Sequence, residues 1–341
     1  MANVYVNDTY LSDIADAIRS KSGLSETYRP IDMGPAIDAI NLEVGVTADM
    51  IATGDFGSSI SGNASSIAGF AFYNCSSLVS VNFPDCTIIG SYAFNSCIAL
   101  TTANFSSCTS IGSYAFRSCS ALTTINFPNC THIENCAFQY CSVLTTASFP
   151  ICTSIKYSAF QNCYSLTTAN FPSCTSIGSS AFYSCRRLTT ANFPNCTIIG
   201  SGAFYYCSSL TTVNFSACRN IGVNAFRNCR SLTTVVFPNC SSIGSSAFYY
   251  CSALTTASFP ICTSIKASAF YNCYNLLSLN LTSVSVVTTL TGTSVFYSTP
   301  IGGRTTSTGG VYGSVYVPAS LLTSFKKATN WTAISSRIVG V

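Results

Sequence analysis

Ten leucines that recur every 22 residues, from Leu78 to Leu276 without one insertion, constrain this chain more than any other feature. If each leucine is counted as repeat position 1, Phe holds position 6 from Phe83 to Phe259, Cys holds positions 9 and 20, and Ala-Phe holds positions 16 and 17. A 22-residue unit cannot bury its apolar face alone, so the copies must stack as coils that contact mainly their neighbours. The sequence therefore predicts a repeat solenoid with one continuous core.

The order of apolar and polar residues within each copy predicts a flattened, mainly β coil with two similar halves. Positions 3 to 7 alternate in polarity, which indicates a short strand with positions 4 and 6 inward, and we expect these strands to stack into one parallel sheet. The Phe and Cys of the first half, such as Phe171 and Cys174, recur 11 residues later as Phe182 and Cys185. We call positions 1 to 11 the first arch and positions 12 to 22 the second arch. The sequence leaves open whether both arches form continuous sheets.

The consensus of the copies, LTTANFPNC followed by TSIGSSAFYSC, resembles a known repeat family. Its first half fits the leucine-rich-repeat pattern LxxLxLxxN/C, with Ala and Phe in the second and third apolar places. Together the two halves resemble the BspA-type leucine-rich repeats of bacterial surface and phage proteins, over residues 67–297. The resemblance implies a solenoid used for attachment or binding, with no chemistry attached.

Nineteen cysteines fall every 11 residues from Cys75 to Cys273 and predict two internal ladders of free thiols. A small buried thiol acts as a weak donor and a hydrophobe where the coil turns. Disulfides are the alternative, but inward side chains on parallel coils are poorly aimed at one another. Zinc is disfavoured because a spacing of 11 differs from CxxC pairs. We expect Cys136, at position 15, to be partly exposed, and His132 and Glu134 to be solvated turn residues.

The two ends of the chain do not repeat. Residues 1–44 carry two helical stripes, which predict a hairpin, and their wording resembles the short N-terminal module of tail-associated proteins from phages and prophages of Gram-positive bacteria. That resemblance implies attachment to other virion proteins; a simple helical cap is the alternative. Residues 45–66 are interpreted as a linker and N-terminal cap. Residues 298–341 are predicted to form a strand-helix C-terminal cap with Trp331 as a lid.

Charge and residue type exclude several classes of function. Only 8% of the residues are charged, which is too few for a disordered chain or a coiled coil. The net charge of +4 is weak and no nucleic-acid motif is present, so we expect no nucleic-acid partner. Within the repeats only Asp85 and Glu134 are acidic, and they lie more than two coils apart, so a pair of carboxylates across a cleft is absent. We predict no enzyme, no catalytic residue, no cofactor and no metal.

No targeting segment is recognised. The start MANVYVNDTYLSD lacks both a basic region and an apolar run, and no stretch of the chain approaches 18 apolar residues. We therefore expect no membrane insertion. The phage resemblance indicates a virion protein made in the bacterial cytoplasm, and a cytoplasmic protein is the alternative.

The binding surface is predicted by comparing copies position by position. The sheet face is a monotonous row of Thr and Asn, whereas positions 18, 19, 21 and 22 vary and are rich in Tyr and Arg, the composition of adaptable binding surfaces. A purely structural tyrosine ladder, with arginines that serve solubility, is the alternative. The predicted ligand-binding residues are Tyr183, Arg186, Arg187, Tyr205, Tyr206, Arg227, Arg230, Tyr249, Tyr250 and Tyr271.

These features favour a phage tail-associated receptor-binding or adhesion protein whose solenoid binds a bacterial cell-envelope glycan or surface protein. The alternative is a non-enzymatic structural or protein-interaction module, such as a virion decoration or an intracellular leucine-rich-repeat protein. A homo-oligomer is expected only by analogy with trimeric attachment proteins, so the oligomeric state is left open.

Overall fold

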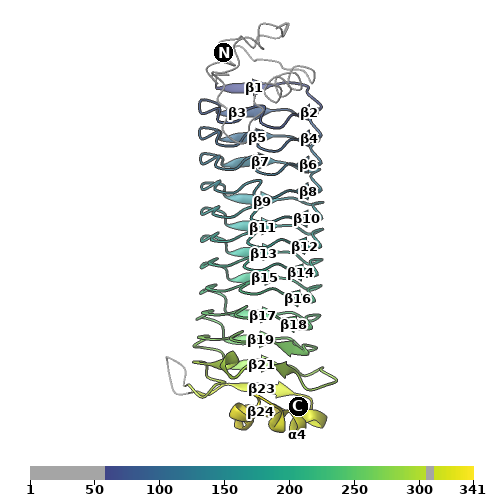
Figure 1. Ribbon diagram of the computed structural model, residues 1–341, viewed down its shortest axis with the longest axis vertical. Helices are drawn as coiled ribbons and strands as arrows, with labels where there is room; N and C mark the ends of the chain where they lie inside the picture. Colours follow the sequence, from purple (N-terminus) through teal and green to yellow (C-terminus); the bar gives the residue numbers. More distant parts are fainter. Residues whose placement is uncertain (1–57, 305–310) are drawn as a thin grey trace, which may run out of the picture. The chain divides into compact units, whose positions relative to one another are not determined.

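A computed structural model describes residues 58–304 and 311–341 of the protein and shows a parallel β-solenoid with coils of about 22 residues (Figure 1). This confirms the predicted fold class. The solenoid divides into two compact units, which we describe separately. The first holds the described residues up to Cys152 together with Ala159–Leu166, and the second holds Thr153–Ser158 and Thr167–Val341. The predicted attachment module, residues 1–44, lies outside the described residues, as do residues 45–57 of the predicted linker.

In the first unit each coil contributes one strand per arch. The first-arch strands are β1 (Ser59–Ser61), β3 (Ser80–Asn82), β5 (Thr102–Asn104), β7 (Thr124–Asn126) and β9 (Thr146–Ser148). The second-arch strands are β2 (Ser66–Ile67), β4 (Ile88–Ile89), β6 (Ser110–Ile111) and β8 (His132–Ile133). Strands pair in parallel with their counterparts one coil away, as in the Ser80 to Thr102 register of β3 and β5.

The second unit repeats this plan. Its first-arch strands are β11 (Thr168–Asn170), β13 (Thr190–Asn192), β15 (Thr212–Asn214), β17 (Thr234–Val236), β19 (Thr256–Ser258) and β21 (Ser278–Asn280). Its second-arch strands are β10 (Ser154–Ile155), β12 (Ser176–Ile177), β14 (Ile198–Ile199), β16 (Asn220–Ile221), β18 (Ser242–Ile243), β20 (Ser264–Ile265) and β22 (Thr289–Leu290). All seven of these second-arch strands belong to one sheet.

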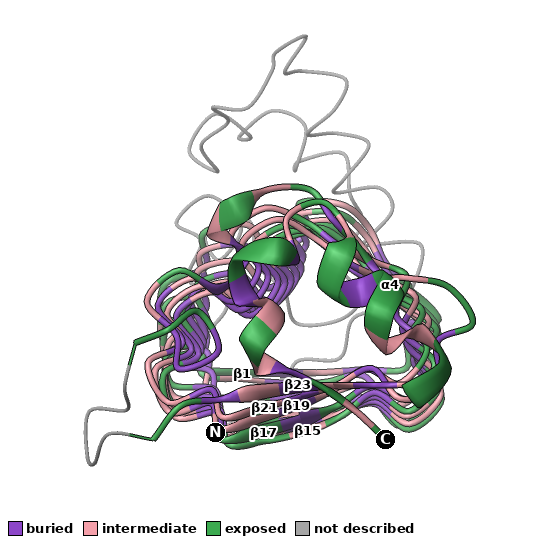
Figure 2. Ribbon diagram, turned by 90° about the horizontal axis from the view of Figure 1, so that it is seen from below, coloured by how far each residue is buried: buried purple, intermediate pink, exposed green. Residues whose placement is uncertain are grey.

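Stacked phenylalanines are among the buried residues of each coil. Buried segments recur at the same places in successive coils (Figure 2). Phe204 lies parallel to Phe226 in the next coil at a centroid distance of 5.3 Å, and Phe193 lies parallel to Phe215 at 5.4 Å. The two columns meet edge to face, as Phe204 and Phe215 do at 5.7 Å and 70°. Each such pair contributes about 0.5–1.5 kcal/mol beyond burial. The repeat thus converts two Phe positions into two continuous aromatic columns.

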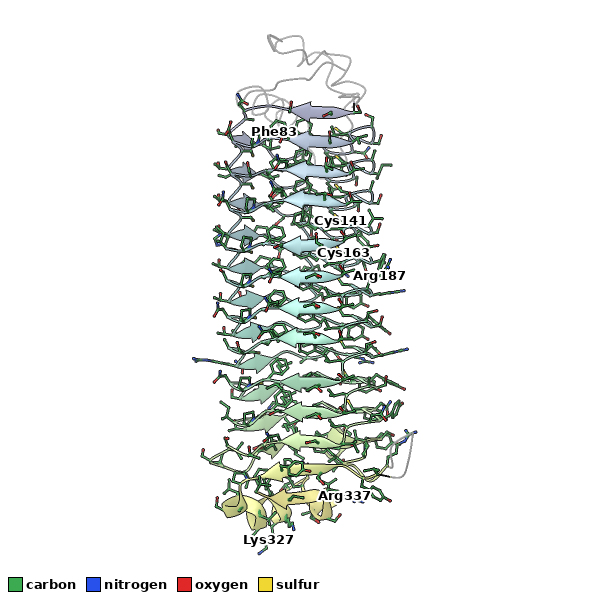
Figure 3. All side chains as sticks on the ribbon, turned by 180° about the vertical axis from the view of Figure 1, so that it is seen from behind. Phe83, Cys141, Cys163, Arg187, Lys327 and Arg337 are labelled. Atoms are coloured by element: carbon green, nitrogen blue, oxygen red, sulfur yellow. The ribbon has the colours of Figure 1, made fainter. Side chains whose placement is uncertain are left out.

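The cysteine ladders hold free, buried thiols that hydrogen-bond to backbone carbonyls, as the sequence predicts. At position 20, the Cys163 thiol donates to the carbonyl of Phe138 in the preceding coil, with 3.1 Å between sulfur and oxygen, and its side chain lies within the coil (Figure 3). At position 9, the Cys196 thiol donates to the Ile198 carbonyl at 3.2 Å. The expected exposure of Cys136 is wrong. It is only 3% exposed, because it follows the stack of rings that Phe70, Tyr92 and Tyr114 form at the same repeat position.

The expectation of one continuous first-arch sheet is also wrong. In the first unit one sheet ends at β7 before β9, and in the second unit one sheet ends at β15 before β17. Both ends coincide with the end of an asparagine ladder on the outer face. Asn126 donates its amide to Asn104 at 2.7 Å and Asn214 donates to Asn192 at 2.8 Å, but Ser148 and Val236 follow.

The inward residue beside each interruption is correspondingly less protected. Ile125 in β7 and Val213 in β15 are half-buried, whereas Ala103 and Ala191, at the same repeat position in coils within a continuous sheet, are buried. At both interruptions the end of coil-to-coil pairing thus coincides with the end of an asparagine ladder and with a less buried inward residue.

The second unit ends in the predicted strand-helix cap. It comprises η2 (Thr293–Phe296), β23 (Ser314–Val317), η3 (Ala319–Leu321), α4 (Leu322–Lys327), η4 (Thr332–Arg337) and β24 (Ile338–Gly340). Trp331 is fully buried, packs edge to face with Phe325 at 5.1 Å and donates its indole N–H to the Thr288 carbonyl at 2.6 Å. Trp331 thus covers the last coil. Within the described parts of the chain, no helix is long and apolar enough to span a membrane.

Candidate binding surface: a column of tyrosines and an arginine

Backbone hydrogen bonds between coils help to hold the side chains of the second arch in register. In every coil, positions 15 and 19 adopt positive φ, as at Gly202 (61°) and Tyr206 (62°). This turn points the N–H of position 19 at the carbonyl of position 18 in the next coil. Tyr206 N–H thus donates to the Arg227 carbonyl at 2.9 Å and Tyr250 N–H donates to the Tyr271 carbonyl at 2.9 Å. Residues at position 18 therefore lie one coil apart in a straight row.

In the second unit this row is almost entirely aromatic. We call it the Tyr/Arg column, and its members are Tyr183, Tyr205, Arg227, Tyr249, Tyr271 and Tyr297. Tyr183 stacks on Tyr205 at a centroid distance of 5.2 Å, and Tyr249 stacks on Tyr271 at 4.8 Å. Both pairs are parallel to within 6°. At roughly 4.8 Å per coil, the column extends about 25 Å.

Arg227 takes the place of a ring within the column. Its guanidinium carbon lies 4.4 Å from the ring centroid of Tyr249 and 5.4 Å from that of Tyr205. Its Nη1 donates to Asn224 Oδ1 at 3.4 Å, while its Nε is buried and has no hydrogen-bond partner. A guanidinium between two rings is held flat by cation–π contact on each face. The charge is therefore fixed in direction.

Second-row tyrosines flank the column at position 19. Tyr206 packs edge to face against Tyr205 at 4.6 Å, and Tyr250 tilts against Tyr249 at 5.1 Å. Tyr206 is 38% exposed. A bulky side chain at positive φ costs about 1–2 kcal/mol, so these rings occupy positions that favour Gly or Asn.

The predicted rim arginines lie beside this surface in sequence. Arg186, Arg187 and Arg230 are exposed at positions 21 and 22, and Figure 3 shows Arg187 pointing away from the coil. The Arg186 carbonyl accepts a hydrogen bond from the Ser209 N–H at 3.2 Å, which fixes the backbone of the rim. Ring contacts within the column and to its flanking tyrosines thus join seven of the ten predicted residues, and the other three are exposed cations.

All Lys, Arg, Asp and Glu side chains in the second unit are of one sign, positive. Its sequence ranges, 153–158 and 167–341, contain eleven Lys and Arg and no Asp or Glu. Apart from the chain terminus, no carboxylate of this unit can neutralise the arginines. Burial raises the pKa of Tyr205 above its ordinary value, and the Tyr206 phenol adds to the rise although Arg227 opposes it. The Tyr205 phenol is therefore a protonated donor at neutral pH.

The first unit carries a shorter aromatic stack at a different repeat position. Phe70, Tyr92 and Tyr114 stack at position 15, with centroid distances of 4.7 and 4.6 Å. Arg117 lies 5.6 Å from the Tyr114 ring and 5.8 Å from the Tyr140 ring, again with a buried Nε that has no partner. A ring-flanked guanidinium therefore occurs in both units.

Two contributors, Tyr297 and Arg304, escaped the sequence prediction. Tyr297 extends the column, since it stacks on Tyr271 at 4.7 Å, and Arg304 lies 4.6 Å from the ring of Tyr274, which packs against Tyr250. Tyr297 follows Tyr271 by 26 residues instead of 22, so a fixed 22-residue register misses it. The segment SVFYS, which matches SAFYY of the regular copies, is the signal that identifies it.

The described residues offer little for chemistry. Among residues 58–304 and 311–341, no three His, Cys, Asp or Glu side chains are grouped to hold a metal ion. His132 is exposed, and its Nδ1 lies 2.8 Å from the Thr131 hydroxyl. The surface instead offers phenol and guanidinium donors, which suits recognition.

Several solved structures are similar to this chain. A leucine-rich cell surface protein from Faecalibacterium prausnitzii is 25% identical, with a TM-score of 0.46, over 82% of this chain and 87% of its own. A leucine-rich-repeat protein from Bacteroides ovatus is 24% identical, with a TM-score of 0.33, over 65% and 78%. The Treponema pallidum leucine-rich-repeat protein is 22% identical, with a TM-score of 0.33, over 64% and 78%. No curated protein matches the chain.

The family itself is defined by the repeats. The model of the BspA type leucine-rich repeat region matches residues 58–167, 131–255 and 175–302, which together cover more than half of the sequence. A solenoid of this kind is typically a scaffold for interaction rather than catalysis. The chain belongs to the BspA-type leucine-rich-repeat family.

Proposed function

We propose that this protein is a receptor-binding or adhesion protein whose Tyr/Arg column, with its flanking tyrosines, binds a component of the bacterial cell envelope. The observation that carries the proposal is the column itself. Six coils contribute one ring or guanidinium each to a continuous outer row, with Tyr206 and Tyr250 beside it at positive φ. Aromatic side chains kept in a costly backbone conformation indicate a role other than folding.

The sheet face is a weaker candidate because its side chains bond to one another. Asn192 donates to Asn170 at 2.7 Å, and the Thr189 hydroxyl donates to the Thr167 carbonyl at 3.0 Å. Groups that already hydrogen-bond within the protein have less capacity left for a ligand. The second arch combines variable residue type, rigid rings and uncompensated charge, which favours it as the recognition surface.

Binding of the full-length chain to isolated bacterial envelopes tests this proposal. The variant Tyr206→Ser/Tyr250→Ser should lose at least tenfold in affinity for the envelopes that the natural protein binds. The matched control is Tyr92→Ser/Tyr114→Ser, which removes two rings that also lie at positive φ but belong to the stack of the first unit. Equal affinity of both variants and the natural protein would contradict the proposal.

We place the protein on a phage tail as part of the same proposal. Its support is the sequence of residues 1–44, which resembles the N-terminal module of tail-associated proteins and lies outside the described residues. Mass spectrometry of purified phage particles, with and without detergent washing, tests this placement. Absence of the chain from washed particles would favour the alternative of a general protein-interaction module.

A further inference from the structure

We infer that the Tyr/Arg column binds a linear polyanion whose phosphodiester groups repeat along its length, as in the phosphate-linked glycans of bacterial envelopes. This inference rests on the proposed function and names its ligand class. It is argued from three properties of the second unit: which ring surfaces are available, which hydrogen-bonding groups are present, and which charges are uncompensated.

Most ring faces in the column are covered by the neighbouring ring or guanidinium group. Tyr183 and Tyr205 lie face to face, Tyr249 and Tyr271 lie face to face, and Arg227 covers facing sides of Tyr205 and Tyr249. A neutral sugar that stacks on an open aromatic face therefore finds no such face in the middle of the column. What the inner rings present to a ligand is their edges and hydroxyl groups.

The groups that remain are donors. Each tyrosine hydroxyl can donate one hydrogen bond, and the guanidinium group of Arg227 has further N–H groups beyond the Nη1 bond to Asn224. These donors recur once per coil, at about 4.8 Å. A phosphodiester matches this pattern because its two non-bridging oxygens accept hydrogen bonds and carry a negative charge. A chain of such groups can follow the column from coil to coil.

The charge of the unit agrees with an anionic ligand. The eleven cationic side chains of ranges 153–158 and 167–341 face no acidic side chain from within those ranges. Arg186, Arg187 and Arg230 are exposed near the column in sequence, and Arg304 caps Tyr274. Guanidinium groups bind phosphate oxygens through charge-assisted hydrogen bonds. Planar fixation of Arg227 between two rings lowers the entropy it would lose on binding.

The test is binding of the full-length protein to immobilised poly(glycerol phosphate), with poly-glutamate and dextran as comparison probes. We expect saturable binding to poly(glycerol phosphate) that weakens between 50 and 200 mM salt, roughly tenfold or more weaker binding to poly-glutamate, and none to dextran. Equal binding to both polyanions would overturn the phosphodiester assignment.

Variants then locate the site. Arg227→Gln should weaken poly(glycerol phosphate) binding at least tenfold, whereas Arg219→Gln, which removes the same charge from an exposed arginine that precedes β16, should weaken it less than twofold. Tyr205→Phe keeps the stack, removes one hydroxyl and should weaken binding several-fold without risk to the fold. Equal losses in Arg227→Gln and Arg219→Gln would show general charge attraction and overturn the site.

Binding to bacterial envelopes with and without phosphodiester glycans distinguishes a failure of the ligand class from a failure of the proposed function. If envelopes stripped of phosphodiester glycans still bind the protein, and Tyr206→Ser/Tyr250→Ser still abolishes that binding, the ligand class is wrong while the proposed function holds. If neither natural nor stripped envelopes bind, both fail.

Discussion

The thiol of Cys207 donates a hydrogen bond to the backbone carbonyl of Phe182, which lies in the preceding coil 3.1 Å away. The same bond recurs between Cys229 and Phe204 at 3.2 Å. Each position-20 cysteine in this series therefore links its own coil to the one before it. The ladder of thiols is a set of weak crosslinks between coils, made without disulfide chemistry.

Replacement of one such thiol tests its role as a donor. Cys207→Ala should lower the free energy of unfolding by about 1–3 kcal/mol, because a buried carbonyl loses its partner and a small cavity opens. Cys207→Ser should cost less, since its hydroxyl can donate to the same Phe182 carbonyl. Urea unfolding followed by circular dichroism measures both values. Equal costs would show that the thiol contributes only volume.

Alkaline pH should unfold the solenoid through its buried thiols. Burial raises the pKa of Cys174 and Cys262 from 9.0 to about 11 and that of Cys218 to about 12. The folded state thus keeps protons that the unfolded state releases. The stability from these groups is complete below pH 9 and is lost as pH rises toward 11–12, at about 1.4 kcal/mol per pH unit for each thiol.

Thiolate absorbance and circular dichroism, recorded together from pH 7 to 12, check this prediction. The two signals should change in one transition above pH 9. Thiolate formation near pH 9 in a protein with an unchanged circular dichroism spectrum would show that the thiols are accessible and ordinary.

Gly202 allows the cost of the left-handed backbone to be measured. Its φ is 61°, and a Cβ built there would meet only Ser180 Oγ at 3.7 Å and Tyr205 Cβ at 3.8 Å, which are ordinary contacts. Gly202→Ala should therefore cost about 1 kcal/mol from backbone conformation alone. Gly202→Asn should cost less than about 0.5 kcal/mol, since Asn tolerates this region, as Asn224 does in the next coil at φ 56°. Thermal and urea unfolding measure both costs. An equal loss of unfolding free energy in Gly202→Asn and Gly202→Ala would contradict this prediction.

The interruption between β15 and β17 should be repairable. Val236→Asn places an amide where it can donate to Asn214 Oδ1 and should add about 0.5–1.5 kcal/mol of stability. Val236→Thr, which keeps the β-branched shape without an amide, is the control. Hydrogen exchange at the Phe215 amide should slow in the Asn variant only, because that amide faces the residue 236 carbonyl in the regular pairing pattern. An unchanged exchange rate at the Phe215 amide in Val236→Asn would show that the asparagine ladder does not control strand pairing.

Most structural features that lie within a single coil can be predicted from the repeat pattern. Position-by-position counting predicts the buried Phe columns and the free thiol ladders, because each depends on periodicity and on residue size. The Trp331 lid is predicted from the non-repeating C-terminal segment instead. The interruption of the first-arch sheet was not foreseen. It coincides with a change from Asn to a non-amide residue in the next coil, as from Asn214 to Val236, and this is a relation between neighbouring coils.

The same distinction applies to the candidate site. Its residue types and positions are visible in the sequence, but the sandwich of Arg227 between two rings requires the exact alignment that positive φ at position 19 imposes. The burial of Cys136 is missed because position 15 is polar in most copies. In the first unit, however, rings at position 15 of the preceding coils form a stack that Cys136 follows. Tyr297 was missed because the last coil is longer than the others.

The backbone bonding of the second arch has a consequence for inheritance. Since backbone N–H and C=O groups align positions 18 and 19 from coil to coil, a mutation there can change the side chains that the surface presents while the fold persists. Copies of identical length also permit unequal recombination that adds or deletes one coil without a frameshift. Such a gene can vary both the residues and the length of the proposed binding surface while the buried core of each coil is kept.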